Sequence, residues 1–190
     1  PLPNVGVYIS DNPNYGRTRS RADGMFDMVV NGGSLLVVKF EKNGYLPVQR
    51  RVQLPWRRFF RMPDVHLVTL DATTSFIDLS TTVPIQIARG SLVSDDAGGR
   101  QATVLFPRGV KASMTIWSPH QVIPLNSITV RATEYTVGDK GPNTMPAELP
   151  CNSGYTYCVE VSADEAMAAG ADTVSFDKPL VFYLENFIGF

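Results

Sequence analysis

The stretch that decides the fold is Leu35-Leu36-Val37-Val38-Lys39-Phe40-Glu41. Its side chains alternate with a period of two, and both faces are apolar until Glu41. This pattern is typical of a central strand that is partly covered on both faces. Asn31-Gly32-Gly33 and Asn43-Gly44 flank this stretch. We interpret them as turns, because these residues tolerate the positive φ that tight turns require.

The same period-two pattern extends through the rest of the chain. Alternation recurs at residues 83–88, 128–133 and 155–162, and Ala22-Asp23-Gly24 and Gly98-Gly99 supply further turn signals. Short strands at spacings of about 8–12 residues, separated by such turns, favour β-sandwiches. The sequence therefore predicts an all-β fold, with two β-sandwich domains in tandem.

One short helix interrupts this pattern. Ser162-Ala163-Asp164-Glu165 has the composition of a capping box, in which the Ser and Glu side chains satisfy backbone amides reciprocally. Good helix formers follow at Ala166–Ala169, and Gly170 is a natural left-handed stop. We predict a helix of about two turns that closes an open end of the second sandwich.

The length of the chain suits two domains. At 190 residues it is long for one small sandwich and sufficient for two domains of about 100 residues. The polar, small stretch Asp71–Ser75 lacks apolar alternation and marks the seam. We therefore place the first domain at residues 1–72 and the second at residues 73–190.

Composition narrows the class of protein. The chain is 44% hydrophobic and 18% charged, which is ordinary for a globular protein and argues against disorder. It contains no apolar run long enough for a spanning helix, so no membrane insertion is predicted. The candidate basic stripe for nucleic-acid binding consists of Arg50, Arg51, Arg57, Arg58 and Arg61. These arginines are better explained as a solvated strand edge, so nucleic acid is not an expected partner.

The two cysteines, Cys151 and Cys158, lie on either side of the turn signal Asn152-Ser153-Gly154. A disulfide across the neck of this short loop fits an oxidising compartment. Two free thiols are the alternative, because the side chains can point apart. Zinc is disfavoured, since no further Cys or His lies nearby to complete four ligands.

The sequence carries no clear catalytic pattern. His66 and His120 lack partners at the spacing of a catalytic triad. The carboxylate pairs Asp95-Asp96 and Asp164-Glu165 lack calcium-loop spacing, and the first is explained as a hairpin tip. We therefore predict no catalytic, cofactor-binding or metal-binding residues, and an enzyme is the least favoured class.

The N-terminal motifs resemble a known family. In chain order they are Pro1–Val7, Ser20–Asp27, Asn31-Gly32-Gly33, Phe40–Tyr45 and Leu54-Pro55-Trp56-Arg57-Arg58-Phe59-Phe60. Together they are similar to the transthyretin-related, carboxypeptidase-regulatory-like β-sandwich of teneurins and of bacterial YD-repeat (Rhs-type) proteins. The resemblance covers residues 1 to about 72. Domains of that family open with one further strand before the first motif, so we expect that strand to be missing here.

The resemblance implies a structural role in an extracellular protein, secreted or at the cell surface. Residues 73–190 match no motif of the family, but their position suggests a β-rich segment that caps or plugs the downstream YD-repeat shell. Such proteins include polymorphic toxins and adhesive surface proteins. The alternative is an adhesion module that binds a carbohydrate or a cell-surface receptor. An exposed row of aromatic side chains, such as Trp117 with Tyr135 or Tyr157, would favour that alternative.

The run from Leu54 to Phe60 has two interpretations. Leu54, Trp56, Phe59 and Phe60 lie close together beside a proline that cannot donate to a β-ladder. The side chains either close the core of the first domain or form an aromatic anchor for a second domain or a partner, since Trp and Arg dominate interface hot spots. We name these four residues as the candidate interface.

Overall fold

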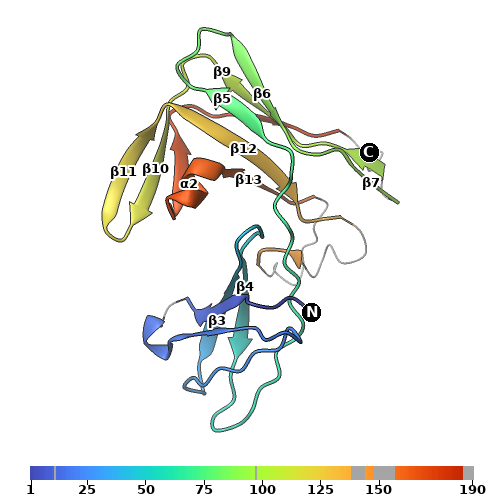
Figure 1. Ribbon diagram of the computed structural model, residues 1–190, viewed down its shortest axis with the longest axis vertical. Coiled ribbons are helices and arrows are strands. Elements are labelled where there is room, and N and C mark those ends of the chain that lie inside the picture. Colours follow the sequence, from blue (N-terminus) through green and yellow to red (C-terminus); the bar gives the residue numbers. More distant parts are fainter. Residues whose placement is uncertain (11, 97, 138–143, 148–156, 186–190) are drawn as a thin grey trace. The chain divides into compact units, whose positions relative to one another are not determined.

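The computed structural model describes residues 1–10, 12–96, 98–137, 144–147 and 157–185 (Figure 1). The chain forms two compact units. Unit 1 comprises Pro1–Thr69 with Asp139–Thr156, and unit 2 comprises Leu70–Gly138 with Tyr157–Phe190.

Unit 1 contains an antiparallel sheet of four strands in the order β2-β1-β3-β4. The strands are β1 (Gly6–Ile9), β2 (Arg17–Arg19), β3 (Leu35–Glu41) and β4 (Val48–Gln53), with the 3-10 turn η1 (Pro13–Tyr15) between the first two. Strand β3 pairs with β1 on one side and with β4 on the other. The prediction of a central strand at residues 35–41 is therefore confirmed.

One face of this sheet carries the core of unit 1. Leu36, Val38 and Phe40 of β3 are buried at alternate positions, as the period-two pattern requires. The ring of Phe26 packs edge-on against Phe40, with 5.6 Å between the ring centroids. On the opposite face Leu35 is 50% exposed, so that face is open at the start of β3.

A distant segment of the chain completes unit 1. The backbone amide of Gln49 in β4 donates to the carbonyl oxygen of Pro146 at 3.1 Å. The guanidinium of Arg50 donates to the carbonyl oxygen of Met145 at 2.8 Å, and Met145 is buried. The segment 144–147 therefore lies beside the edge strand β4, although nothing in its sequence indicates this.

Unit 2 contains several small antiparallel sheets (Figure 1). Two three-stranded sheets have the orders β13-β12-β5 and β15-β9-β6, a third has the order β11-β10-β14, and β7 pairs with β8 as a hairpin. The strands are β5 (Ser75–Asp78), β6 (Ile85–Arg89), β7 (Val93–Asp95), β8 (Gly98–Arg100), β9 (Thr103–Pro107), β10 (Ala112–Trp117), β11 (His120–Leu125), β12 (Ser127–Glu134), β13 (Val159–Ala163), β14 (Thr173–Phe176) and β15 (Val181–Tyr183).

The core of unit 2 forms where these sheets face one another. Ile77, Phe106 and Ile128 are among its most deeply buried side chains, and they come from β5, β9 and β12. The ring of Phe106 meets that of Phe176 edge-on, with 5.9 Å between centroids. Residues far apart in the sequence therefore supply one apolar cluster.

The helix α2 (Asp164–Ala168) confirms the predicted helix, although it is only five residues long. Its C-terminal end is a Schellman motif, because Gly170 at φ +65° donates to Met167 and Ala171 donates to Ala166. The expected stop at Gly170 is thus confirmed.

The predicted capping box is wrong. The N-cap is Ala163, which forms no side-chain cap, and the hydroxyl of Ser162 has no hydrogen-bond partner in the described part of the chain. The carboxylate of Glu165 instead accepts the backbone amide of Thr129, at 2.8 and 3.0 Å, and the Thr129 hydroxyl at 2.8 Å. The tertiary contact with β12 therefore replaces the local cap.

The secondary structure confirms the predicted all-β class with one short helix. Within the described ranges, no helix combines the length and apolar character that crossing a membrane requires.

Candidate protein interface

The run after β4 is fastened to the sheet at its first residue. The amide of Leu54 donates to the carbonyl oxygen of Ser34 at 3.1 Å, and Gly33 donates to the carbonyl oxygen of Leu54 at 2.9 Å. The Leu54 side chain is half-buried and packs against the core of unit 1. Leu54 therefore anchors the run and contributes little exposed surface.

Two of the motifs quoted above pack directly on each other. A Cβ on Gly32 would lie 2.3 Å from the carbonyl oxygen of Pro55, so only glycine fits there. Gly33 has φ +86°, and a Cβ built on it would lie 3.4 Å from the indole ring of Trp56. The two glycines therefore provide the surface on which Pro55 and Trp56 lie.

Beyond Pro55 the chain turns away from the core. Arg57 adopts φ +54°, which is uncommon for a residue other than glycine. Trp56 is 63% exposed, Phe60 is 45% exposed, and Phe59 is fully exposed. The interpretation that these rings close the core of unit 1 is therefore wrong, because the alternate residues of the strands already fill it.

Arginines accompany the exposed aromatic rings. The guanidinium of Arg57 lies 5.7 Å from the centre of the Trp56 ring, within the range of a cation–π contact. Arg58 and Arg61 are exposed, and in the described part of the chain no carboxylate pairs with Arg57, Arg58 or Arg61. We call residues 55–61 the aromatic–arginine loop. It offers three rings and three unpaired cations.

The five arginines noted in the sequence do not form one stripe. Arg50 is half-buried and is occupied with the carbonyl oxygens of Gln49 and Met145, each at 2.8 Å. Arg51 lies in β4, whereas the other three belong to the aromatic–arginine loop. These five arginines are close in the sequence but do not form one basic surface.

His120 and the first residue of each carboxylate pair contact neighbouring side chains. His120 stacks on Trp117 across the end of the β10–β11 hairpin, with 5.0 Å between ring centroids. Asp95 ends β7 at the tip of the β7–β8 hairpin and pairs with Arg100, and Asp164 pairs with Arg131. Among the described residues, no three His, Cys, Asp or Glu side chains are grouped so that they could hold a metal ion.

The candidate aromatic row in unit 2 is not present as suggested. Tyr135 is buried, with 2% of its surface exposed, whereas Trp117 is 61% exposed. Tyr157 is half-buried, and its ring lies 6.4 Å from that of Phe182. Tyr135 therefore does not share an exposed surface with Trp117, and this observation does not favour the adhesion alternative.

The predicted disulfide stays a prediction. Cys158 immediately precedes β13 and is half-buried. Burial, together with the nearby Glu160 charge, raises the pKa of the Cys158 thiol. Its expected partner, Cys151, lies outside the described residues.

Comparison with known proteins relates the chain to one family. Residues 1–67 match the model of the teneurin TTR-like domain. Human Teneurin-4 is 40% identical over 65 residues, which cover 34% of this chain and 2% of that protein. Zebrafish (Danio rerio) Teneurin-3 is 42% identical over 62 residues, or 33% of this chain and 2% of that protein. Human Teneurin-1 is 27% identical over 184 residues, covering 83% of this chain and 7% of that protein. The chain thus spans only a small part of each relative's length.

Proposed function

We propose that this chain, which is teneurin-like and carries an N-terminal TTR-like domain, is a non-catalytic structural module of a larger extracellular protein. Unit 1 packs against other domains of the same polypeptide through its aromatic–arginine loop. Unit 2 caps or plugs the end of a downstream YD-repeat shell.

The exposure of the aromatic–arginine loop carries this proposal. A fully exposed Phe59 beside exposed Trp56 and Phe60 is unfavourable in water. Contiguous exposed apolar surface rimmed by polar groups marks protein interaction sites. Trp and Arg are also the residues that contribute most at interface hot spots.

A partner within the same polypeptide fits the comparisons best. The relatives are many times longer than this chain, so their matching segments lie among much additional protein. A surface tethered beside its partner is covered at high effective concentration, and this favours permanent packing. The three unpaired arginines predict carboxylates or backbone carbonyls on the opposing surface.

Limited trypsin digestion tests the proposal, because trypsin cleaves after arginine. The 190-residue chain and the full-length gene product are digested in parallel, and cleavage after Arg57, Arg58 and Arg61 is followed by mass spectrometry. We expect cleavage to be at least tenfold slower in the full-length protein. Arg108, exposed in a turn of unit 2, is the internal control site. Equal cleavage rates within the loop would contradict the proposal.

Two substitutions separate the interface from the core. Trp56→Ala is expected to change the stability of the 190-residue chain by less than about 1 kcal/mol, because the ring is mostly exposed. Leu54→Ala is expected to cost about 1–3 kcal/mol, because that side chain packs on the core. In the full-length protein Trp56→Ala should restore rapid cleavage of the loop. If it unfolds the chain instead, the ring serves the core.

A further inference from the structure

Two facing three-stranded sheets of unit 2 are joined by hydrogen bonds along one pair of edges. Strand β5 is the edge of one sheet and β6 the edge of the other. The Gln86 side chain links them, because its amide donates to the carbonyl oxygen of Asp78 at 2.7 Å and accepts the Asp78 amide at 2.9 Å. The amide of Arg89 also donates to the Ser75 hydroxyl at 3.0 Å. These bonds hold the β5 and β6 edges together.

At the opposite edges the described residues show no hydrogen bond between β13 and β15, although the ring of Tyr157, just before β13, lies 6.4 Å from that of Phe182 in β15. Among the described residues, β13 is paired with β12 alone and β15 with β9 alone. Over the residues that the structure describes, no further strand hydrogen-bonds the outer edge of either one. Each outer edge therefore presents backbone amides and carbonyls that are ready to pair with another strand.

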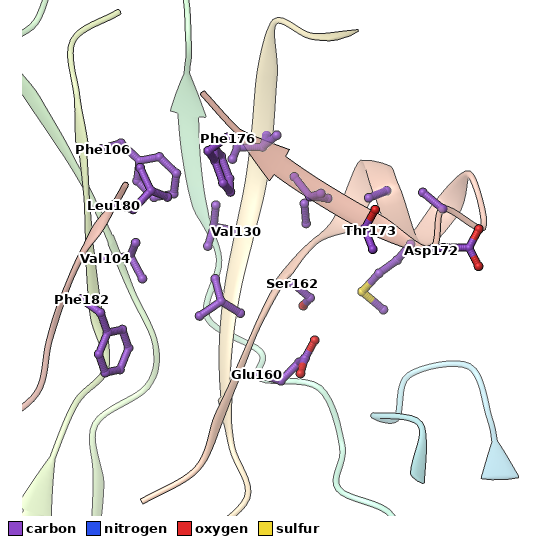
Figure 2. Close-up of a pocket in the computed structure, with 17 residues that line it drawn as sticks. Val104, Phe106, Val130, Glu160, Ser162, Asp172, Thr173, Phe176, Leu180 and Phe182 are labelled. Carbon is purple, nitrogen blue, oxygen red and sulfur yellow. The ribbon is translucent and has the colours of Figure 1, made fainter. Parts of the chain in front are cut away.

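An apolar groove of about 490 Å³ lies between these two edges. Figure 2 shows Phe106 and Phe182 on one wall, Ser162 and Glu160 on the other, and Val130 between them. Helix α2 and strand β14 contribute further apolar side chains at one end. We call this feature the β13–β15 groove.

The rim of the β13–β15 groove is itself apolar and exposed. Val161 and Phe182 are each 44% exposed, and Met167 is 42% exposed. An exposed apolar groove beside open strand edges invites aggregation unless it is covered. The exposed apolar rim therefore indicates that another segment covers the β13–β15 groove permanently.

Two polar groups on β13 are poorly accommodated by their apolar surroundings. The hydroxyl of Ser162 is buried and has no partner among the described residues, although buried hydroxyls are normally hydrogen-bonded. Much of Glu160 is accessible to solvent, yet the apolar surroundings of its carboxyl group raise its pKa. Both groups line the groove and would gain from a neighbour that brings polar backbone atoms.

We propose that an extended segment with apolar side chains at alternate positions, supplied by another domain of the same polypeptide, adds as a β-strand in the β13–β15 groove. This inference rests on the proposed function, in which unit 2 is built into a larger assembly. The segment pairs its backbone with the outer edge of β13 or β15 and places alternate side chains between the sheets. Addition of a strand satisfies the open edge and the apolar groove together. A small apolar molecule would fill the groove but leave both edges unpaired.

Amide hydrogen exchange, read by mass spectrometry, tests this proposal in the 190-residue chain and in the full-length gene product. We expect the amides of β13 or β15 to exchange at least tenfold more slowly in the full-length protein. Equal exchange in both proteins would overturn the proposal. Slow exchange together with a small apolar molecule that native mass spectrometry detects in the full-length protein would also overturn it.

A substitution that places a charge at the rim of the β13–β15 groove tests whether the groove is the binding site. Val161→Asp should abolish the slow exchange in the full-length protein, while the 190-residue chain keeps its melting temperature within a few degrees. Val122→Asp on β11 is the control, because Val122 is a similarly exposed strand residue, at 57%, and is not part of the groove. If Val161→Asp leaves the slow exchange intact, the groove is not the binding site.

The same exchange data separate this proposal from the proposed function. Protection of residues 55–61 without protection of β13 or β15 would refute only the strand addition. Protection of β13 or β15 without protection of residues 55–61 would refute only the role of the aromatic–arginine loop.

Discussion

The Asp71 carboxylate accepts two hydrogen bonds from Ser91, one from its backbone amide and one from its hydroxyl, each 2.6 Å long. It accepts a third from the amide of Thr73 at 2.8 Å, and Arg131 donates to its carbonyl oxygen at 2.6 Å. Burial opposes ionisation of Asp71, but the hydrogen bonds from Ser91 and Thr73 outweigh it and lower the pKa of the carboxyl group. Asp71 thus fastens the beginning of unit 2 to the β6–β7 connection.

This arrangement predicts a pH-dependent contribution to stability. Because the pKa is lower in the folded state, ionised Asp71 stabilises the fold fully above its unfolded pKa of about 3.9, and this contribution is lost as the pH falls through the folded value. Asp71→Asn should lower stability at pH 7 by about 1–2 kcal/mol and flatten the acid limb. Urea midpoints between pH 3 and pH 7 test this, with exposed Asp64→Asn as control. An unchanged acid limb would refute the role of Asp71.

We expect that any side chain at position 32, beneath the aromatic–arginine loop, lowers the stability of unit 1. Gly32→Ala would place a methyl group 2.3 Å from the carbonyl oxygen of Pro55, so unit 1 should lose about 1–3 kcal/mol of stability. Gly6→Ala is the matched control, since its Cβ would lie at an ordinary 3.4 Å from the nearest atom, the carbonyl oxygen of Glu41. Chemical denaturation followed by Trp fluorescence measures both. If the two variants are equally stable, the close approach does not constrain the loop.

Arg100 holds a second buried network in unit 2. Its side chain is 1% exposed and donates to Glu134 at 2.6 Å and to Asp95 at 2.8 Å, and the Glu134 side chain is 6% exposed. Arg100→Leu leaves the buried Glu134 carboxylate without this cation, so we expect a loss of about 3–5 kcal/mol. The double variant Arg100→Leu/Glu134→Leu should recover part of that loss. A double variant as unstable as the sum of the two single variants would show that the charges act independently.

The predicted Cys151–Cys158 bridge has a direct test. If it forms, reduction should cost roughly 2–3 kcal/mol by the chain-entropy model for so short a loop. Alkylation of the non-reduced protein in denaturant, followed by mass spectrometry, separates a bridge from a shielded thiol. Denaturation removes the burial that raises the Cys158 pKa in the fold. Two alkylated cysteines under these conditions would end the prediction and weaken the extracellular assignment.

The strands and the resemblance to a family could be predicted from the sequence. The alternation of residues 35–41 identified a central strand, and Gly170 identified the end of the only predicted helix. The motifs of the N-terminal region identified the resemblance to teneurins, which the match over residues 1–67 confirms. Each of these signals is local, because side-chain period and backbone conformation depend on neighbouring residues.

The candidate interface could be predicted only in part from the sequence. The sequence singled out Trp56, Phe59 and Phe60, but it did not decide whether their rings were buried or exposed. That outcome depends on the distant contact between Gly32 and Pro55 and on the residues that already fill the core. The Ser162–Glu165 pattern failed for the same kind of reason, since Thr129 lies 36 residues away from Glu165.

By itself, the sequence of this protein determined which side chains share a face of each strand, where the helix ends and which family the first unit resembles. The tertiary structure alone decided which faces are covered, with the β5 and β6 edges joined and a groove left between β13 and β15. Alternation is a property of the local backbone, whereas burial depends on which distant segments pack together. A strand can therefore be recognised from its own residues, but the partner that covers it cannot.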